Sequence, residues 1–594
     1  MIPQNVLHTL HNLNKKVFFK MKLEKLSISL RNVINLSIDE IKTLPEKQRC
    51  GLLAMEIDEE FIPAARVIIV LNEKNEQLTN LPKQYIVDQK AQFVVGEIPF
   101  EIIKELTEDS KVKHIDKPSA LYPDLDDALF WSGADEVISQ NLQSQNLNEN
   151  LDGEGVLIGL IDSGINYLHP DFSFEVDGSL ETNIEGIWLP SGTEWTREEI
   201  NTAINSDNPQ DIVPHLDFTG HGTLVAACAA STGRGSGYKG VAPKAGILMA
   251  ASSSGNLETA DESNSYLLAI RWFEQKATEL NKPIVINISK GSNDGPRDGS
   301  LPFEGYLDAV IEANNNLVIC KTAGNHGNKK HHATGNAKVD DENSTQPTVE
   351  VVNRLSSFFI DIWYEAEDSF TIELINPEGL TTGIVEENPI NLGVLNFMDG
   401  NGVIDNEMNI NVTYEPENQT LNGAKHFQFL LNLREGTNGI PLGEYQVRIR
   451  PSSNESAPNG NYHCWLDYTR FSGMNDVVFL PPYQTDSYTL NAGACGMNTI
   501  IVGNWNDYSG ERNPTSSLGL TRDGRNGVSV IAPGTEIVGA AHSRALEYSA
   551  EPFIQVRTGT SFACPIVSGI AALIYQEALL LNPTQALPSF SEIR

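Results

Sequence analysis

Nearly continuous apolar runs alternate with amphipathic segments over two separated stretches of the chain. The runs cover residues 156–161, 284–288, 317–320 and 499–502. Runs of this kind are typical of strands that are covered on both faces, as in a parallel sheet. Between two of them, segment 265–280 has the apolar spacing of an amphipathic helix. This alternation predicts a doubly wound α/β fold with a mostly parallel sheet.

The N-terminal part of the chain shows a smaller pattern of its own. Strand-like apolar segments and one short helical segment alternate there, which predicts an α+β unit over residues 22–128. Residues 129–150 are expected to form a linker, because the stretch 140–150 is rich in Asn and Gln. The expected elements of the unit are strands over 52–57, 66–71, 93–98 and 112–115 and a helix over 99–106.

A third pattern occupies residues 335–485. Apolar and polar residues alternate over 358–364 and 445–450, and turns rich in Asn, Gly and Pro separate such segments. This pattern predicts an all-β sandwich. The α/β pattern resumes afterwards, so the β unit is expected to be an insertion into one α/β domain made of residues 151–334 and 486–594.

The charge of the chain narrows its possible partners. Its 594 residues include 78 Asp and Glu against 42 Lys and Arg, which gives a formal net charge of −36. Such an excess argues against nucleic acid or an anionic membrane as the main partner. Solubility is the simplest interpretation of the excess, and a basic substrate is the alternative. No apolar run is long enough to span a bilayer.

The N-terminal residues and the cysteines indicate neither a secretory signal nor a metal site. The first twenty residues have only 17–19 as an apolar core, which is too short for a secretory signal. We therefore expect a cytoplasmic protein that acts as a monomer. None of the six cysteines forms a CxxC pair, so no zinc site is indicated. Cys228, Cys320 and Cys564 lie in apolar runs and are predicted to be reduced core residues.

Three short segments contain candidate catalytic residues. Asp162 follows the first buried strand, where functional groups gather in an open α/β sheet, although most Asp-Ser-Gly sequences are simple turns. His221 lies between two glycines at the start of a helix of small residues, and the alternative there is a helix-capping loop with an incidental His. Ser561 opens an apolar helix whose free N–H groups favour an oxyanion, and the alternative is an N-cap serine. Together they supply an acid, a base and a nucleophile in one of the known orders of a catalytic triad.

The same three segments resemble the active-site signatures of the subtilisin-like serine proteases. Further matches follow in the order of that family: Gly-Val-Ala-Pro at 240–243, Ile-Ser-Lys-Gly at 288–291, Thr-Ala-Gly-Asn at 322–325 and Ala-Pro-Gly at 532–534. By these seven ordered matches the chain is identified as a member of the family. The resemblance implies a subtilisin-like fold and peptide-bond hydrolysis.

The resemblance also implies roles for individual residues of the triad. Ser561 is the expected nucleophile, His221 the base, and Asp162 the residue that orients His221 and stabilises its cation. The side chain of Asn325 and the backbone N–H of Ser561 are expected to bind the oxyanion. The implied product of the first step is an acyl-enzyme intermediate.

Substrate binding is expected to involve strand addition along the cleft. The resemblance assigns this role to Ser289, Lys290 and Gly291, with Ser254 and Gly255 as the second side. Lys290 departs from the apolar residue common at the middle position. Its side chain is expected to point away from the cleft, and a preference for acidic substrate positions is the alternative.

A narrower resemblance is to the clostridial Csp-type germination proteases. His-Pro-Asp-Phe at 169–172 and Trp-Thr-Arg-Glu-Glu-Ile-Asn at 195–201 carry it. Those proteins have a jelly-roll insertion between the oxyanion asparagine and the serine, where 335–485 lies here, and an N-terminal prodomain whose end resembles 98–118 and 121–126. The resemblance implies an autoprocessing endopeptidase whose partners are polypeptide substrates and its own prodomain. It does not carry over the substrate or the germination role.

Two functional alternatives remain open at this stage. A catalytically silent pseudoprotease would act as a regulatory binding protein, but the complete set Asp162, His221, Ser561 and Asn325 favours activity. The β insertion either braces the fold or serves as a carbohydrate- or protein-binding module, and bracing is the favoured interpretation.

A metal site is not clearly indicated. Residues 399–405, Asp-Gly-Asn-Gly-Val-Ile-Asp, have oxygen ligands at spacings similar to those of a calcium loop but lack its final Glu. Many subtilisin-like enzymes bind calcium elsewhere, yet no ligands are assigned here. We expect no cofactor and no metal site, with calcium as the alternative.

Overall fold

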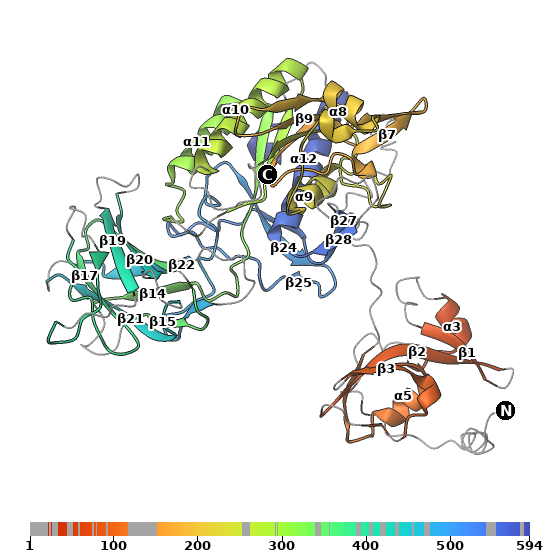
Figure 1. Ribbon diagram of the computed structural model, residues 1–594, viewed down its shortest axis with the longest axis horizontal. Helices are drawn as coiled ribbons and strands as arrows, with labels where there is room; N and C mark the ends of the chain where they lie inside the picture. The colour runs from red at the N-terminus through yellow and green to blue at the C-terminus, as the bar shows by residue number, and fades with distance from the viewer. Residues whose placement is uncertain are drawn as a thin grey trace. The chain divides into compact units, whose positions relative to one another are not determined.

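The chain, seen here in a computed structural model, divides into two compact units, Met1–Tyr122 and Pro123–Arg594 (Figure 1). In the first unit the structure describes residues 22, 25, 34–43, 52–57, 60–73, 77–78, 80–90 and 93–116. In the second unit it describes residues 151–593 except 252–261, 292, 294, 339–345, 356, 388–393, 403–407, 416–422, 434–438, 454–456, 468–475, 542–553 and 582–586. The predicted linker 129–150 and Cys50 lie outside the described residues.

The first unit is built on a five-stranded antiparallel sheet. Its elements are α3 (Ile38–Thr43), β1 (Leu52–Ile57), β2 (Glu60–Leu71), η3 (Lys83–Tyr85), β3 (Ile86–Lys90), β4 (Phe93–Pro99), α5 (Phe100–Leu106) and β5 (Val112–Asp116). The strands follow the order β1-β2-β4-β3, and β5 pairs with β2. Val67 and Ile69 of β2 are buried in one core with Ile103 and Leu106 of α5.

The strand β2 is longer than the sequence pattern predicts, because it starts at Glu60 and not at residue 66. Proline is unfavourable inside a sheet because it has no N–H to donate. In the structure Pro63 pairs with Ala54 of β1, whereas the pairing with β4 begins at Ala64. The proline therefore lies where β2 has a single neighbouring strand, a position that tolerates the missing donor.

The second unit contains a nine-stranded sheet that is mostly parallel. Its strands are β6 (Leu157–Asp162), β9 (Ile184–Trp188), β10 (Glu194–Thr196), β11 (Gly246–Ala251), β12 (Ile284–Ile288), β13 (Leu317–Thr322), β24 (Ile500–Asn506), β25 (Glu511–Arg512) and β26 (Val530–Pro533). They follow the order β10-β9-β11-β6-β12-β13-β24-β25, with β26 paired to β24. Only β10 and β25 pair antiparallel with their neighbours, so the predicted α/β fold with a mostly parallel sheet is confirmed.

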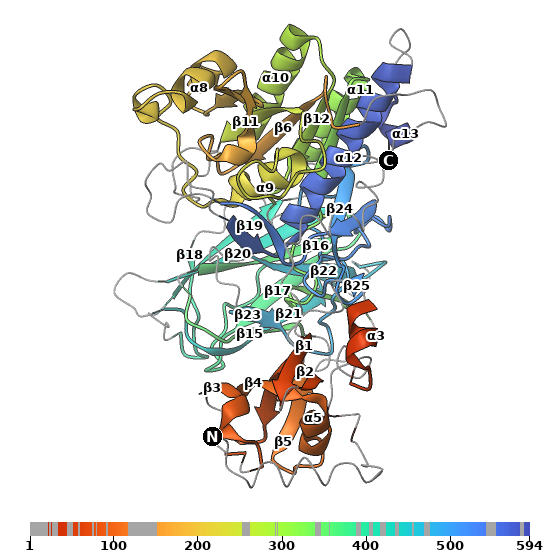
Figure 2. The same cartoon turned by 90° about the vertical axis from the view of Figure 1, so that its right-hand side faces the viewer.

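Helices cover both faces of this sheet (Figures 1 and 2). They are α8 (Arg197–Ile204), α9 (His221–Ala230), α10 (Glu262–Leu280), α11 (Pro302–Ala313), α12 (Thr560–Leu581) and the short α13 (Phe590–Ile593). Because side chains alternate along a strand, Ile158 and Leu160 of β6 enter the core that includes α9 and α12, whereas Leu157 and Ile161 enter the core that includes α10 and α11. The sheet thus buries side chains on both faces, as its continuous apolar runs predict.

Residues between β13 and β24 form two antiparallel sheets. Their strands are β14 (His332–Asn336), β15 (Thr348–Val351), β16 (Ser357–Tyr364), β17 (Phe370–Ile375), β18 (Val394–Leu395), β19 (Met408–Glu415), β20 (Lys425–Leu433), β21 (Gly443–Pro451), β22 (Asn461–Asp467) and β23 (Val477–Phe479). The orders are β14-β22-β16-β20-β19-β18 and β17-β21-β15-β23. Phe358 and Phe429 of the first sheet are buried in one cluster with Val349 and Val447 of the second.

Smaller elements and the cysteines complete the second unit. Two-stranded sheets join β7 (Ser173–Val176) to β8 (Ser179–Thr182) and β27 (Ile537–Ala540) to β28 (Ile554–Arg557). Among the described residues, α12 alone is long and apolar enough to cross a membrane, and it packs on α9, β13 and β24 in the core. Cys228, Cys320 and Cys564 are buried free thiols, as predicted, and so are Cys464 and Cys495.

Candidate active site

Asp162 and His221 meet where β6 ends and α9 begins. The Oδ1 atom of Asp162 lies 2.7 Å from Nδ1 of His221 and accepts a 2.7 Å hydrogen bond from the backbone N–H of Ser163. The carboxylate is fully buried, and burial acts to raise its pKa. The charge and hydrogen bond of His221, with the charge of Lys290, outweigh that effect, so the pKa of Asp162 lies below its ordinary value. The site therefore holds an ionised carboxylate against an imidazole that is 23% exposed.

A second buried carboxylate, Asp217, holds the start of α9 in place. Its Oδ1 atom accepts from the backbone N–H of Gly220 at 3.0 Å and from that of Thr219 at 3.2 Å. Its Oδ2 atom accepts from the backbone N–H and the hydroxyl of Thr223, at 2.9 and 2.7 Å. A carboxylate at a helix N-terminus satisfies orphan N–H groups and complements the helix dipole. Asp217 thus fixes the turn from which His221 projects.

The same carboxylate also ties α9 to the end of β6. The hydroxyl of Ser163 donates to Asp217 Oδ1 at 2.8 Å and accepts from the backbone N–H of Gly222 at 2.9 Å. The approach is so close that a Cβ atom on Gly222 would lie 2.2 Å from the carbonyl oxygen of Gly164. Glycine after His221 is therefore required by the contact between the two segments that carry the Asp and the His.

Ser561 lies in the first turn of α12 and contacts Ser289, the residue that follows β12. Pro565, inside the helix, has no N–H to donate to the carbonyl of Ser561. That carbonyl accepts instead a 2.9 Å hydrogen bond from the hydroxyl of Ser289. The Ser561 hydroxyl in turn donates to the carbonyl of Ser289 at 3.1 Å, and no hydrogen bond joins it to His221 in this state. A hydrogen bond from Ser561 to His221 would therefore require a rotation of the serine side chain.

Asn325 is fixed beside the turn that precedes Ser561. Its Oδ1 atom accepts from the backbone N–H of Thr560 at 3.0 Å and from the Thr560 hydroxyl at 3.1 Å. The Thr560 hydroxyl also contacts the Thr322 hydroxyl and accepts from the backbone N–H of Gly324 at 3.3 Å. With Oδ1 engaged in this way, the amide N–H groups of Asn325 are left for a ligand next to Ser561.

Lys321, a buried cation, supports the segment Ser289, Lys290 and Gly291 from behind. It lies on β13, is 2% exposed, and donates from Nζ to the carbonyl oxygen of Lys290. Burial lowers the pKa of Lys321 to about 8, and the nearby carboxyl of Glu304 acts against that shift. Burial likewise raises the pKa of Glu304 to about 7. Lys321 thus holds the backbone of the segment predicted to bind substrate, and Glu304 accepts from the backbone N–H of Cys495 at 2.7 Å.

The inserted strands contact the loop that follows this segment through two arginines. The guanidinium of Arg297 lies 4.6 Å from the ring centre of Trp465 on β22, and that of Arg522 lies 5.8 Å from the ring centre of Trp363 on β16. Arg297 also donates to the carbonyl of Leu490 at 3.2 Å. Cation–π contacts of this kind are stronger when they are removed from water. The insertion is thereby joined to the loop that follows Gly291 and to the loop between β25 and β26.

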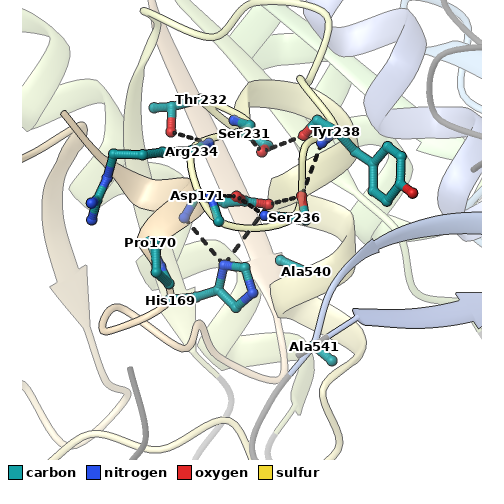
Figure 3. Close-up of polar contacts among 12 residues, drawn as sticks. His169, Pro170, Asp171, Ser231, Thr232, Arg234, Ser236, Tyr238, Ala540 and Ala541 are labelled. Atoms are coloured by element: carbon teal, nitrogen blue, oxygen red, sulfur yellow. Dashed lines mark hydrogen bonds and ion pairs between the residues drawn. The ribbon is translucent and has the colours of Figure 1, made fainter. Parts of the chain in front are cut away.

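The hydrogen bonds of Asp171 decide whether this carboxylate fits a cation such as calcium. It is fully buried, and its Oδ1 atom accepts from the backbone N–H groups of Gly235 at 2.7 Å and Ser236 at 2.9 Å. Its Oδ2 atom accepts from the Ser236 hydroxyl, so donors face both oxygens (Figure 3). Calcium requires free oxygen ligands, so these residues do not fit it.

The other residues predicted to bind substrate or considered for calcium lie partly outside the described residues. Ser254 and Gly255 fall in the gap 252–261, and 403–405 of the calcium-like loop fall in the gap 403–407. The described part of that loop is a turn in which Asp399 Oδ1 accepts from the backbone N–H of Asn401 at 2.9 Å. Within the described ranges, no three His, Cys, Asp or Glu side chains are grouped so as to hold a metal ion.

Asp217 and Arg297 were missed by sequence reasoning for different reasons. Asp217 lies four residues before His221, and an acidic residue ahead of a helix start is a recognisable capping signal. Arg297 has no comparable signal, because its partners Leu490 and Trp465 are distant in sequence.

The chain is similar to a known protein family and to individual members of it. A sequence model of the subtilase family matches residues 153–362 and 456–587, more than half of the chain. Subtilisin of Bacillus sp. strain TA39 is 30% identical over 214 residues, which cover 36% of this chain and 43% of that protein. Subtilisin E of Bacillus subtilis strain 168 is 25% identical over 232 residues, which cover 39% and 49% of the two chains. The chain thus matches less than half the length of these curated relatives.

A solved structure is similar over a larger share of this chain. The CspB protease of Clostridium perfringens superposes with a TM-score of 0.64 at 26% identity, over 77% of this chain and 90% of that one. This share of the chain is about twice that covered by the two curated subtilisins. The chain belongs to the subtilase family.

Proposed function

We propose that this chain is a serine endopeptidase that cleaves polypeptides through Asp162, His221 and Ser561. The observation that carries the proposal is the 2.7 Å contact between the buried carboxylate of Asp162 and Nδ1 of His221. A carboxylate that binds Nδ1–H leaves Nε2 of the imidazole as the base. Family membership and the placement of Ser561 at the start of α12 support the same assignment.

The chemistry would proceed in two stages. His221 takes the proton of the Ser561 hydroxyl as its oxygen attacks the scissile carbonyl, and then gives a proton to the leaving amine. Water subsequently attacks the acyl-enzyme by the same proton route in reverse. Asp162 keeps His221 in the required tautomer and stabilises the imidazolium.

The oxyanion would be held by two donors. The backbone N–H of Ser561 lies at the N-terminus of α12, where helical N–H groups have no partner within the helix. The second donor is the amide of Asn325, whose opposite atom is anchored by Thr560. Loss of one such side-chain donor costs roughly 100- to 1,000-fold in kcat in subtilisin, which is the reference case for this effect.

The proposal extends to the domain organisation. Residues 22–128 would be a prodomain, 129–150 its linker, 151–334 and 486–594 the catalytic domain, and 335–485 a jelly-roll-like insertion. The extended likeness to the CspB protease supports this division. The two antiparallel sheets with their common core support the assignment of the insertion. Autoprocessing between the first two parts is proposed with it.

Covalent labelling tests the nucleophile. The full chain is incubated with a fluorophosphonate probe and the adduct is located by peptide mass spectrometry. Labelling is expected at Ser561 and is expected to disappear in Ser561→Ala. Ser568→Ala is the matched control, because Ser568 is a buried serine of the same helix whose hydroxyl bonds to Asn287 and to the Cys564 carbonyl. An unlabelled wild type that is folded would favour a regulatory pseudoprotease instead.

Autoprocessing has a separate test. N-terminal sequencing of the purified chain is expected to show a second N-terminus within 117–150 in the wild type and only the intact chain in Ser561→Ala. Intact wild type that still takes the probe would reject autoprocessing and keep the nucleophile.

A further inference from the structure

Side chains of β28 hold the carbonyl groups of the turn that leads into His221. The amide Nε2 of Gln555 donates to the carbonyl of Gly220 at 2.6 Å, and a terminal guanidinium nitrogen of Arg557 donates to the carbonyl of Thr219 at 2.7 Å. The Nε group of Arg557 also donates to Oε1 of Gln555 at 2.9 Å. Gln555 and Arg557 together form the β28 clamp, which binds two consecutive carbonyl groups of the turn.

The direction of the clamp follows from the alternation of side chains along β28. Successive side chains of a strand point to opposite faces, so Gln555 and Arg557 share one face. Ile554 and Val556 lie on the other face, where they are 52% and 58% exposed, whereas the two clamp residues are half-buried. The neighbouring strand β27 lies beside α9 (Figure 1). The strand β28 thus presents its polar face to the start of α9 and its apolar face to solvent.

The clamp joins the segment of the base to the segment of the nucleophile. From Arg557 the chain continues through Gly559, whose N–H donates to the carbonyl of Gly534 at 2.8 Å, into Ser561. The hydroxyl of Ser561 bonds to another partner in this state and not to His221. The distance between these two side chains therefore depends on the backbone supports of their segments, and the β28 clamp is a support that spans both.

The turn before His221 is held from two sides by groups of opposite character. Its N–H groups at Thr219 and Gly220 donate to the carboxylate of Asp217, whereas its carbonyl groups at the same residues accept from the clamp. Gly220 has a φ of 69°, a left-handed conformation that glycine adopts at low cost. Asp217 fixes the turn relative to β6, and the clamp fixes it relative to the strand that leads into Ser561.

We propose that Gln555 and Arg557 are positioning residues that set the distance between the base His221 and the nucleophile Ser561. The inference rests on the proposed protease function and adds to it a link between the two segments. Proton transfer requires the imidazole Nε2 and the serine hydroxyl to come within about 2.6–3.2 Å of each other. A displacement of about 1 Å at such a pair costs on the order of 100-fold in rate. Without the clamp the contact between Asp162 and His221 remains, but the imidazole is free to move relative to Ser561.

The test measures steady-state cleavage of a fluorogenic peptide by the full chain, together with the rate of fluorophosphonate labelling at Ser561. Arg557→Leu and Gln555→Leu are each expected to lower kcat by about 10- to 100-fold, with KM within about threefold and a proportional fall in the labelling rate. Gln555→Leu removes no charge, so a common effect of the two changes identifies hydrogen bonding to the turn and not the field of the cation. The double variant is expected to lose less than the product of the two single effects, because both residues belong to one clamp.

Chemical rescue separates positioning from stability. Arg557→Ala leaves room for a small cation, so guanidinium ion, at concentrations far below those that unfold the chain, is expected to raise the kcat of this variant. Sodium ion at the same concentration is the control and is expected to have no such effect. Arg557→Lys keeps the charge but not the planar fork of donors, so it is expected to retain an intermediate kcat. A kcat of Arg557→Ala that does not rise with guanidinium would contradict the role assigned to the Arg557 hydrogen bonds.

Arg525 is the matched control, because its contacts have the same pattern at another place. Its Nε group donates to the carboxylate of Asp523 at 2.7 Å, and a terminal nitrogen donates to the carbonyls of Asp298 and Cys495 at 2.9 and 2.8 Å. These partners lie outside the segments that carry the triad, so Arg525→Leu is expected to keep kcat within about twofold. Val556→Thr, a change on the exposed face of β28, is expected to do the same.

The outcomes distinguish this inference from the proposed function. A folded wild type that takes no fluorophosphonate at Ser561 rejects the protease function, whatever the clamp variants do. A labelled wild type whose Arg557→Leu and Gln555→Leu variants both keep kcat within about twofold overturns the inference and leaves the protease function standing. An equal fall of kcat in Arg525→Leu would overturn it in the same way. If Arg557→Leu does not fold, Gln555→Leu decides the same question.

Discussion

Replacement of Asp217 by asparagine separates the positioning of His221 from its chemistry. In Asp217→Asn one carboxylate oxygen becomes an NH₂ group. If that group faces Thr223, the backbone N–H of Thr223, now bonded at 2.9 Å, loses its acceptor and meets another donor. Hydrogen bonds to charged groups contribute about 1.5–3 kcal/mol each, so we expect a loss of about 3 kcal/mol in the free energy of unfolding.

The catalytic effect should exceed what this loss of stability explains. The first turn of α9 carries both the contacts to Asp217 and the side chain of His221, so a shift of the turn moves the imidazole relative to Asp162. A displacement of about 1 Å at a reacting group costs on the order of 100-fold in rate. We expect kcat to fall by about 10- to 100-fold in Asp217→Asn with KM within about threefold, which is the signature of a lost transition-state interaction. The assay is steady-state hydrolysis of a peptide below the unfolding midpoint, with urea unfolding measured in parallel.

Asp171 provides the matched control for this experiment. Like Asp217 it is fully buried, and it accepts two backbone N–H groups and a hydroxyl from Gly235 and Ser236 in the loop that follows α9. Asp171→Asn should lose a similar free energy of unfolding and keep kcat within about twofold. If Asp217→Asn keeps kcat within twofold, or if both variants lose kcat equally, Asp217 does not position His221 and only stabilises the fold.

Two further predictions concern burial. Burial raises the pKa of Glu304 from 4.5 to about 7, so between these values the folded state binds a proton that the unfolded state has lost, and stability falls as the pH rises through that window. Between pH 5 and pH 8, urea unfolding should show the wild type losing about 3 kcal/mol more of its free energy of unfolding than Glu304→Gln. Equal losses in the two proteins would contradict the assignment. Trp465→Ala removes a side chain that is 2% exposed and contacts Arg297, so it should lower the free energy of unfolding by about 3–5 kcal/mol. The variant should still unfold in a single transition. A separate unfolding transition of the insertion would contradict the coupling of the insertion to the parallel sheet.

The elements of the sheet were predictable because their signals are local. A strand covered on both faces is mostly apolar, and β6, β12 and β13 are buried along their whole length. The start of α10 shows the limit of the method. The helix begins at Glu262 and not at 265, because its first turn is polar and lies outside the apolar repeat that predicts the helix.

The candidate site was predictable only as far as the order of Asp162, His221 and Ser561 in the sequence indicates a role for each of them. Asp162 and His221 are 59 positions apart, and their contact depends on α9 beginning beside the carboxyl end of β6. The resting hydrogen bond of Ser561 with the Ser289 carbonyl could not be anticipated. It depends on the side-chain torsion of one serine, and apo sites commonly hold such contacts until substrate arrives.

The residues that shape the cleft could not be predicted, because the position of each depends on contacts with a distant part of the chain. Asn491 takes its place from glycines at 291 and 324, and Arg297 joins Leu490 to a tryptophan of the insertion. One guanidinium therefore connects the inserted sheets to the residue next to Asn491. The contact between Asp162 and His221 and the contacts of Arg297 therefore rest on different parts of the chain.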